Sequence, residues 1–188
     1  YTAKNGETTI LANITSATGS KGAENLQIIN CNFVDLYGVS AEKANSYCPI
    51  AIYDRQRTTG ATDGIVIDGC TFTTNAAYYI YMYYPGNPNV KPTGDIVIKN
   101  NTFGNTNTSV STAVYVGGTR NNVSVIGNTF VNGTVVITPH NNALCTYTLK
   151  MSVMDNNFVN TSDEKPTVIA LRNFHSLPKC NVTVKDNV

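Results

Sequence analysis

Charged residues are scarce in this sequence. Its 188 residues include 13 Lys and Arg and 12 Asp and Glu, which is 13% of the chain, and the net charge is +1. Globular domains usually carry about 25% charged residues. Domains that bind nucleic acid normally have a basic surplus on one face, so this balance argues against a nucleic-acid partner.

Long apolar runs and closely spaced cysteine pairs are also missing. No segment reaches 18 consecutive apolar residues, which argues against a transmembrane helix and against membrane insertion. No Cys-x-x-Cys spacing occurs among the five cysteines, so we do not expect a zinc site. The chain opens on Tyr1 rather than Met and has no signal-peptide pattern, which predicts a processed product or an excised fragment.

Asn, Thr, Ser and Gly take the place of the missing charges. These residues suit turns and strand surfaces, and the composition favours a secreted or cell-surface protein. Apolar residues make up 41% of the chain, which is enough for the core of one domain.

A short phrase recurs along the chain, most clearly in residues 96–103, which read IVIKNNTF. Two apolar residues alternate with variable ones, and a polar corner and a phenylalanine follow. The first apolar position holds Leu26, Ile65, Ile96, Val123, Met151 and Val182. The second apolar position holds Ile28, Ile67, Ile98, Val125, Val153 and Val184. The corner holds Cys31, Cys70, Asn101, Asn128, Asn156 and Asn187. The closing aromatic residue is Phe33, Phe72, Phe103, Phe130 and Phe158.

The spacing of these copies predicts a β-solenoid. Successive corners lie from 27 residues apart, between Asn101 and Asn128, to 39 residues apart, between Cys31 and Cys70. Alternation by two puts both apolar positions on one face of a strand, and stacked coils about 4.8 Å apart would bury that face. Asn stacked on Asn at the corner would form a ladder of amide hydrogen bonds, and the phenylalanines would stack inside. No copy has the 3.6-residue spacing of a helical repeat.

These repeats resemble the NNTF-type corner repeats of the pectin-lyase-like superfamily. The resemblance covers about residues 24–188 and implies an all-β fold, a right-handed parallel β-helix solenoid of about five to six coils. The superfamily includes polysaccharide lyases and hydrolases, phage tailspikes and surface adhesins, so the fold alone does not determine the function.

The two ends of the chain are expected to differ from the repeats. Residues 1–23 should form an N-terminal cap or part of an earlier coil, and residues 24–188 a single β-helix domain. The last copy of the phrase stops at Val188 and would have an open strand edge. We therefore expect further coils or a neighbouring subunit to stack on this end.

Tyrosines gather in the second strand expected in each coil, and five of the eleven lie in residues 78–84. An inward column of Ile52, Ile80, Val114 and Ile169 would turn the alternate residues outward, although a register slip by one residue would reverse the faces. Outward tyrosines with basic residues nearby suit flat sugar rings or a protein partner. The candidate binding residues are Tyr53, Tyr79, Tyr81, Tyr83, Tyr115, Arg120 and His175. The alternative is that the tyrosines pack beneath the proline-rich segment 85–92 or support a neighbouring coil.

Catalytic candidates come from the same strand ends. The resemblance implies a basic residue with calcium held by acidic residues in a lyase, or paired aspartates in a hydrolase. The candidates are Asp54, Arg55, His140 and Arg172, and they complete no catalytic motif of the superfamily. The alternative is that these four residues are solvated charges on the surface with no catalytic role. The sequence therefore does not decide whether the protein is an enzyme.

A metal site is only weakly indicated. Asp68, Asp155 and Asp186 lie near the corners and could bind calcium if stacked, but Lys99 and Gly127 interrupt the series, so turn formation is favoured and no cofactor is expected.

The five cysteines fall into three groups. Cys31 and Cys70 share the corner position and are interpreted as small apolar fillers, with a disulfide as the alternative. Cys145 and Cys180 both precede a first strand and are the better disulfide candidates, and Cys48 has no obvious partner.

The leading hypothesis is an extracellular β-helix module that recognises a polysaccharide or cell-surface glycan, or that serves as an adhesin or stalk. One alternative is a polysaccharide lyase or glycoside hydrolase domain. Another is a structural subunit of a filament or tail fibre that self-associates through its end coils.

Overall fold

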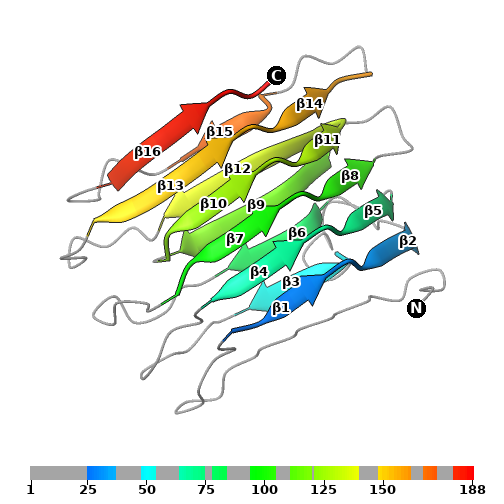
Figure 1. The fold of residues 1–188 in the computed structure, drawn as a ribbon, viewed down its shortest axis with the longest axis horizontal. Coiled ribbons are helices and arrows are strands. Elements are labelled where there is room, and N and C mark those ends of the chain that lie inside the picture. Colours follow the sequence, from blue (N-terminus) through cyan, green and yellow to red (C-terminus); the bar gives the residue numbers. More distant parts are fainter. Residues whose placement is uncertain are drawn as a thin grey trace.

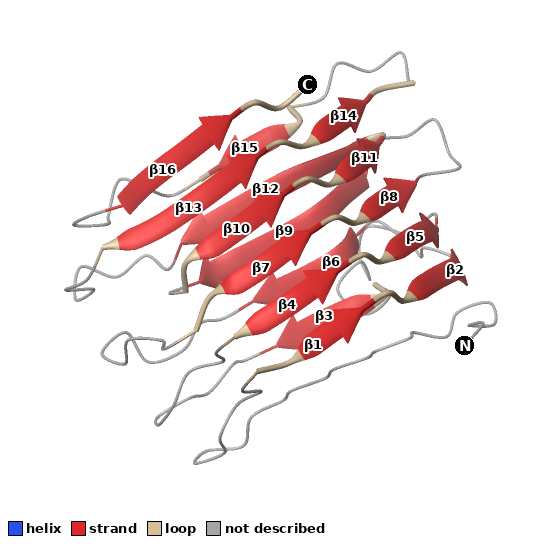
Figure 2. Cartoon of the chain, viewed as in Figure 1, coloured by secondary structure: helices blue, strands red, loops and turns tan. Residues whose placement is uncertain are grey.

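Three parallel β-sheets make up the fold. The computed structural model describes residues 25–36, 48–53, 64–74, 78–83, 94–104, 111–119, 121–139, 148–161, 167–172 and 180–188. Within these ranges all the regular elements are strands, and each strand pairs in parallel with its counterpart one repeat away (Figures 1 and 2). The prediction of an all-β parallel β-helix solenoid is confirmed. Residues 1–23, expected to form a cap, lie outside the described ranges.

The first sheet contains the strands that open each phrase. In spatial order they are β1 (Gln27–Ile29), β4 (Ile65–Asp68), β7 (Ile96–Lys99), β10 (Val123–Ile126), β13 (Leu149–Met154) and β16 (Cys180–Lys185). Ile67 pairs with Ile98, which pairs with Val125, and none of the three is exposed to solvent. Ile65, Ile96 and Val123 of the first apolar position are also unexposed, so both predicted columns lie inside the solenoid in these repeats, whereas Val182 and Val184 at the β16 end are exposed.

The second sheet begins just after the corner. Its strands are β2 (Asn32–Leu36), β5 (Thr71–Thr74), β8 (Thr102–Gly104), β11 (Thr129–Val131) and β14 (Asn157–Val159). Neighbouring phenylalanine rings in these strands stack with centroids 4.7–4.9 Å apart, which confirms the predicted column. The sequence did not separate these strands from the corner, because three to five residues give too short an alternation to recognise.

The third sheet contains the predicted second strands, which are β3 (Ile50–Tyr53), β6 (Tyr78–Tyr83), β9 (Ser111–Thr119), β12 (Gly133–Pro139) and β15 (Ile169–Leu171). Ile80, Val114 and Ile169 belong to one inward column, as predicted. Ile52 also faces inward, but it pairs with Met82 and so lies two residues further along the sheet than predicted.

A left-handed residue makes each corner. The residue immediately before the corner position has a φ between 53° and 64° in all six copies, and these residues are Asn30, Gly69, Asn100, Gly127, Asp155 and Asp186. Gly, Asn and Asp tolerate this backbone conformation better than other residues. Asp155 and Asp186 are therefore turn residues, as the sequence favoured.

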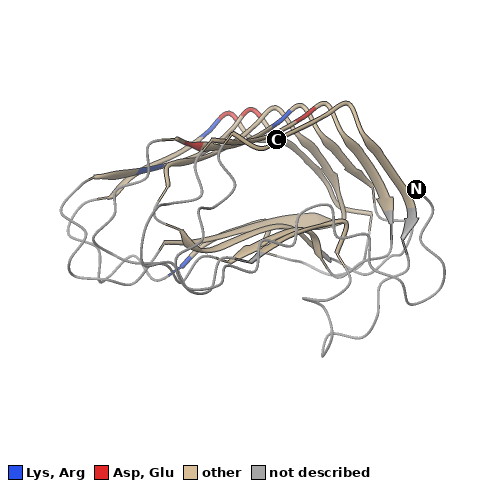
Figure 3. Ribbon diagram, turned by 90° about the horizontal axis from the view of Figure 1, so that it is seen from below, with Lys and Arg blue, Asp and Glu red and all other residues tan. Residues whose placement is uncertain are grey.

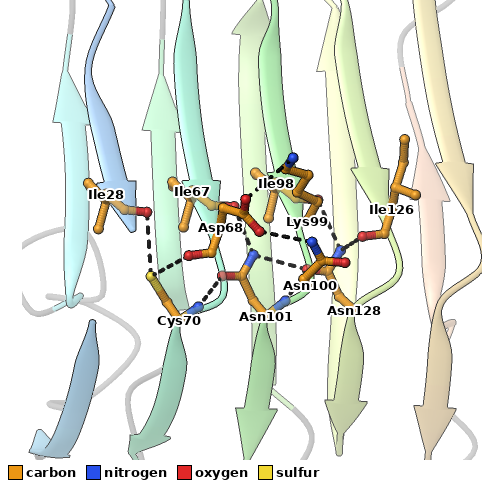
Figure 4. A network of polar contacts seen from close by, with 10 residues as sticks. All are labelled: Ile28, Ile67, Asp68, Cys70, Ile98, Lys99, Asn100, Asn101, Ile126 and Asn128. Carbon is orange, nitrogen blue, oxygen red and sulfur yellow. Dashed lines mark hydrogen bonds and ion pairs between the residues drawn. The ribbon is translucent and has the colours of Figure 1, made fainter. Parts of the chain in front are cut away.

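The corner asparagines form the predicted ladder, and it has a direction. The Asn128 Oδ1 accepts hydrogen bonds from the backbone N–H of Asn101 at 2.9 Å and from its Nδ2 at 3.0 Å. The Asn128 Nδ2 donates to the Ile98 carbonyl at 3.0 Å (Figure 4). Asn156 repeats this pattern on Asn128, and Asn187 repeats it on Asn156. Asn128, Asn156 and Asn187 therefore each bind both the backbone N–H and the side-chain amide of the corner asparagine in the previous repeat. Asn101, Asn128 and Asn156 are each 1% exposed.

Charged residues mark the outside of this bend (Figure 3). The Asp68 carboxylate lies 3.3 Å from the Lys99 Nζ and accepts a hydrogen bond of 2.9 Å from the Asn100 Nδ2. The Asn100 amide and then Lys99 hold the pKa of Asp68 below its ordinary value. Among the described residues there is no group of three or more side chains that could hold a metal ion.

Cys180 is a free cysteine in the structure, so it does not form the disulfide for which Cys145 and Cys180 are the better candidates in the sequence; Cys145 itself lies outside the described ranges. Cys180 is the first residue of β16 and pairs with Leu149 rather than preceding the strand. In the part of the chain that the structure describes, no helix has the length and apolar character to span a membrane.

We predict that Asn128→Ala lowers the free energy of unfolding by roughly 2–4 kcal/mol, because the buried backbone N–H of Asn101 and the Ile98 carbonyl both lose a partner. Urea unfolding followed by circular dichroism measures this. Asn157→Ala is the matched control, since that side chain is exposed and should cost less than about 0.5 kcal/mol. Equal costs for the two substitutions would contradict the role of the ladder.

Candidate functional site

Four tyrosines gather on the outer face of the third sheet, and we call Tyr78, Tyr81, Tyr83 and Tyr115 the tyrosine cluster. Tyr81 and Tyr115 pair across β6 and β9, and their rings stack at 4.8 Å with an angle of 8° between their planes. Tyr78 packs edge-on against both rings, at 5.1 Å and 5.8 Å. Aromatic pairs prefer these two arrangements, so the rings stabilise one another in a fixed geometry.

A glycine makes room for this stack. Tyr115 extends along β9 over Gly117, and a Cβ added at Gly117 would lie 2.5 Å from the Tyr115 ring. Gly117 pairs with Tyr83 on one side and with Thr138 on the other. Any side chain at Gly117 would therefore push the Tyr115 ring out of its place.

The cluster is partly exposed and has a cation beside it. Tyr78, Tyr83 and Tyr115 are half-buried, while Tyr81 is 8% exposed. Burial raises the pKa of Tyr115, the nearby Tyr78 and Tyr83 add to the rise, and the Arg172 guanidinium acts in the opposite direction. Tyr115 therefore stays protonated at neutral pH, and its hydroxyl can donate a hydrogen bond to a ligand.

Cys48 packs beneath the cluster. It is 1% exposed and forms a small apolar group with Ala51 and Tyr81, separate from the main core. Burial raises the pKa of the Cys48 thiol from 9.0 to about 12, so the thiol is neutral and unreactive at neutral pH.

The prediction that Tyr79 is an outward-facing binding residue is wrong, because its side chain lies in the core. It is 0% exposed, and its ring lies nearly parallel to those of Phe72 and Phe103 at 6.3 Å and 6.0 Å. Its hydroxyl donates to the Gly104 carbonyl at 3.5 Å. Strict alternation fails here, because Tyr79 and Ile80 are adjacent and both lie in the core. The neighbouring strand β9 has a register irregularity against β12 at the equivalent place, between Thr134 and Val135.

The other predicted site residues divide into those the structure describes and those it does not. Tyr81, Tyr83 and Tyr115 lie together on the outer face, as predicted. Arg172 directly follows β15, is exposed, and donates its backbone N–H to the Ile137 carbonyl at 3.0 Å. Asp54, Arg55, Arg120, His140 and His175 lie outside the described ranges, as does the side chain of Tyr53, whose backbone pairs with Tyr83.

Sequence reasoning missed three contributors, which are Tyr78, Gly117 and Cys48. Two-residue alternation with Ile80 predicts that Tyr78 faces inward, but it packs with the outer rings. A Gly-Gly pair usually indicates a turn, whereas Gly117 and Gly118 both lie within β9. A glycine two residues after an outward tyrosine is the signal that could have indicated a ring lying over the strand.

The chemistry of this surface is aromatic and polar. Among the described residues of the third sheet and its strand ends, Arg172 is the one charged side chain, and no carboxylate occurs there. The surface can stack flat apolar faces and donate hydrogen bonds from phenol and guanidinium groups. Comparisons of the chain with protein-family models, with curated proteins and with solved structures find no match.

We predict that Cys48 makes the fold less stable at alkaline pH. The thiol of the unfolded chain ionises near pH 9, while the folded thiol stays protonated to about pH 12, so stability is lost as the pH rises through this window. Between pH 8 and pH 10, wild type should lose about 1.4 kcal/mol more than Cys48→Ala, which lacks the ionising group. Urea unfolding at the two pH values measures the difference, and identical losses in the two proteins would mean that the thiol is not buried.

Proposed function

We propose that this chain is a right-handed parallel β-helix of the pectin-lyase-like type, and that it binds polysaccharide or cell-surface glycan chains outside the cell through the tyrosine cluster. The observation that carries the proposal is the stacked Tyr81–Tyr115 pair, with Tyr78 against its edge, on a partly exposed sheet face. Half-exposed aromatic side chains gathered on one face usually form an interaction site.

The shape and chemistry of the cluster support a sugar ligand. Tyrosine offers a flat apolar ring for the C–H face of a sugar and a hydroxyl for hydrogen bonding. Tyr81 and Tyr115 belong to neighbouring repeats, which lie about 4.8 Å apart, and the same outward position holds Ala51 and Val136 in the repeats on either side. A glycan segment lying over these two repeats would contact more than one ring at once. The low charge of the chain agrees with recognition by stacking and neutral hydrogen bonds rather than by ion pairing.

A catalytic role has less support from the described residues. A glycoside hydrolase needs two carboxylates across the scissile bond, and the described strands of the third sheet carry none. The proposal is therefore a binding module, and turnover of a bound glycan would contradict it.

We predict that Tyr115→Leu and Tyr83→Leu each weaken glycan binding about tenfold, because each removes one stacking ring worth about 1–1.5 kcal/mol. A glycan array identifies the ligand, and titration calorimetry measures its affinity. Gly117→Ala should weaken binding through displacement of the Tyr115 ring.

Tyr79→Phe is the control for these variants, since Tyr79 lies on the same strand but faces the core. It should bind as wild type does. The proposal fails if the outer variants keep full affinity while their far-ultraviolet circular dichroism is unchanged, or if reducing or unsaturated sugar ends accumulate during incubation.

A structural role in an assembly is the second candidate. It is favoured because two positions of β16 are exposed although the equivalent positions of the neighbouring repeat lie in the core. Val182 and Val184 of β16 are 44% and 51% exposed, whereas Met151 and Val153, their partners in β13, are each 1% exposed. The outer edge of β16 has no neighbouring strand in the described sheet order. Such an edge can pair with the same edge of a second copy.

We predict that the chain self-associates through β16 and that Val184→Asp shifts it toward the monomer, because a charge would lie in the apolar contact. Sedimentation velocity over a concentration series measures this. Val34→Asp is the matched control, since Val34 is also 44% exposed but lies on β2. A wild-type chain that stays monomeric at all concentrations rules out this role.

A further inference from the structure

The ladder at the bend changes its chemistry at one end. Four repeats place Asn at the corner, but the first two described repeats place Cys31 and Cys70 there. Between Asn101 and Asn128 three bonds of 2.9–3.0 Å link the repeats. Between Cys31 and Cys70 the corresponding contacts are the Cys31 N–H to the Cys70 Sγ and the Cys70 Sγ to the Ile28 carbonyl, both 3.5 Å (Figure 4 shows the latter). The link is therefore weakest where cysteines replace asparagines.

Backbone register holds these two cysteines side by side. The residues that follow them, Asn32 and Thr71, pair across β2 and β5, and the Thr71 N–H donates to the Cys31 carbonyl at 2.9 Å. Neighbouring strands lie about 4.8 Å apart, which is within the Cα separation that a disulfide spans. The Cys70 Sγ lies 3.5 Å from the backbone nitrogen of Cys31, so the Cys70 sulfur already faces the neighbouring cysteine in the folded chain.

The two thiols differ in access. Cys31 is half-buried, whereas Cys70 is 1% exposed and donates to the Ile28 and Asp68 carbonyls. Burial is the main cause that raises the pKa of Cys70. A soluble oxidant would therefore reach Cys31 first, and Cys70 would act second from within the protein.

We propose that Cys31 and Cys70 are an oxidisable pair, which a small-molecule disulfide such as oxidised glutathione converts into a disulfide joining the first two described repeats. The Cys31 thiolate attacks one sulfur of the oxidant, which forms a mixed disulfide and releases one glutathione thiolate. The Cys70 thiol attacks the Cys31 sulfur, and its proton leaves with the second glutathione, which is released as a thiol. The protein loses two electrons and two protons, and the oxidant gains them as two thiols.

This bond would strengthen the contact between the Cys31 and Cys70 corners, which is the weakest in the ladder, without disturbing the contact between Cys70 and Asn101. The Cys70 backbone N–H donates to the Asn101 Oδ1 at 2.8 Å, and that contact does not involve the sulfur. The bond would close a loop across 39 residues, which restricts the unfolded chain. The pair would thus make the stability of the first described repeats depend on the redox state of the surroundings.

Peptide mapping of the intact chain tests the proposal. The folded protein is equilibrated with mixtures of reduced and oxidised glutathione, quenched with acid, alkylated and digested without reductant. We expect a cross-linked peptide containing Cys31 and Cys70, a loss of two hydrogens from the intact mass, and a rise in Tm of roughly 5–10 °C.

Two variants separate this pair from the other cysteines. Cys31→Asn should abolish both the cross-link and the rise in Tm, while Cys180→Ser, which removes a free cysteine of similar exposure, should keep both. The proposal is overturned if Cys31 is recovered only as a free thiol or a glutathione adduct, if it cross-links to another cysteine, or if the Cys31–Cys70 bond forms only in denaturant.

Discussion

The side-chain amide at the bend is the contact on which this fold depends. From Asn128 onward, each corner amide accepts from the backbone and the side chain of the repeat before it and donates to a carbonyl of that same repeat, as Asn128 does to Asn101 and Ile98. A sharp bend interrupts the sheet hydrogen bonds, and buried backbone groups there would otherwise lack partners. The ladder supplies those partners and at the same time fixes the register of the strands on either side.

Much of this arrangement could be predicted, because one physical requirement acts on every repeat in the same way. Residues stacked in register meet their equivalents, so a position that is apolar, amide or aromatic in one copy must be so in the next. Ile67, Ile98 and Val125 form the inner column for this reason, and Phe72 and Phe103 stack because their copies share a spacing from the corner. Repetition turned weak local patterns into a firm prediction of the fold.

The candidate site was harder to predict, since its residues do not repeat. Tyr79 and Tyr81 look equivalent under strict alternation, yet one lies in the core and the other on the outer face. The difference arises at Tyr79, where tertiary packing against Phe72 and Phe103 overrides the two-residue period. The role of Gly117 likewise depends on a tertiary feature, since the Tyr115 ring lies over the glycine within the strand.

The separation between core and surface gives the tyrosine cluster its significance. The inner columns and the ladder stabilise the solenoid without Tyr81 or Tyr115, which belong to a distinct apolar group outside the core. Aromatic rings at outward positions are poorly solvated, and here they also require a glycine at Gly117 within a strand, where glycine is unfavourable. Stability alone does not explain that combination. The binding role that we propose for this surface would explain it, because rings held by one another lose little further freedom on binding.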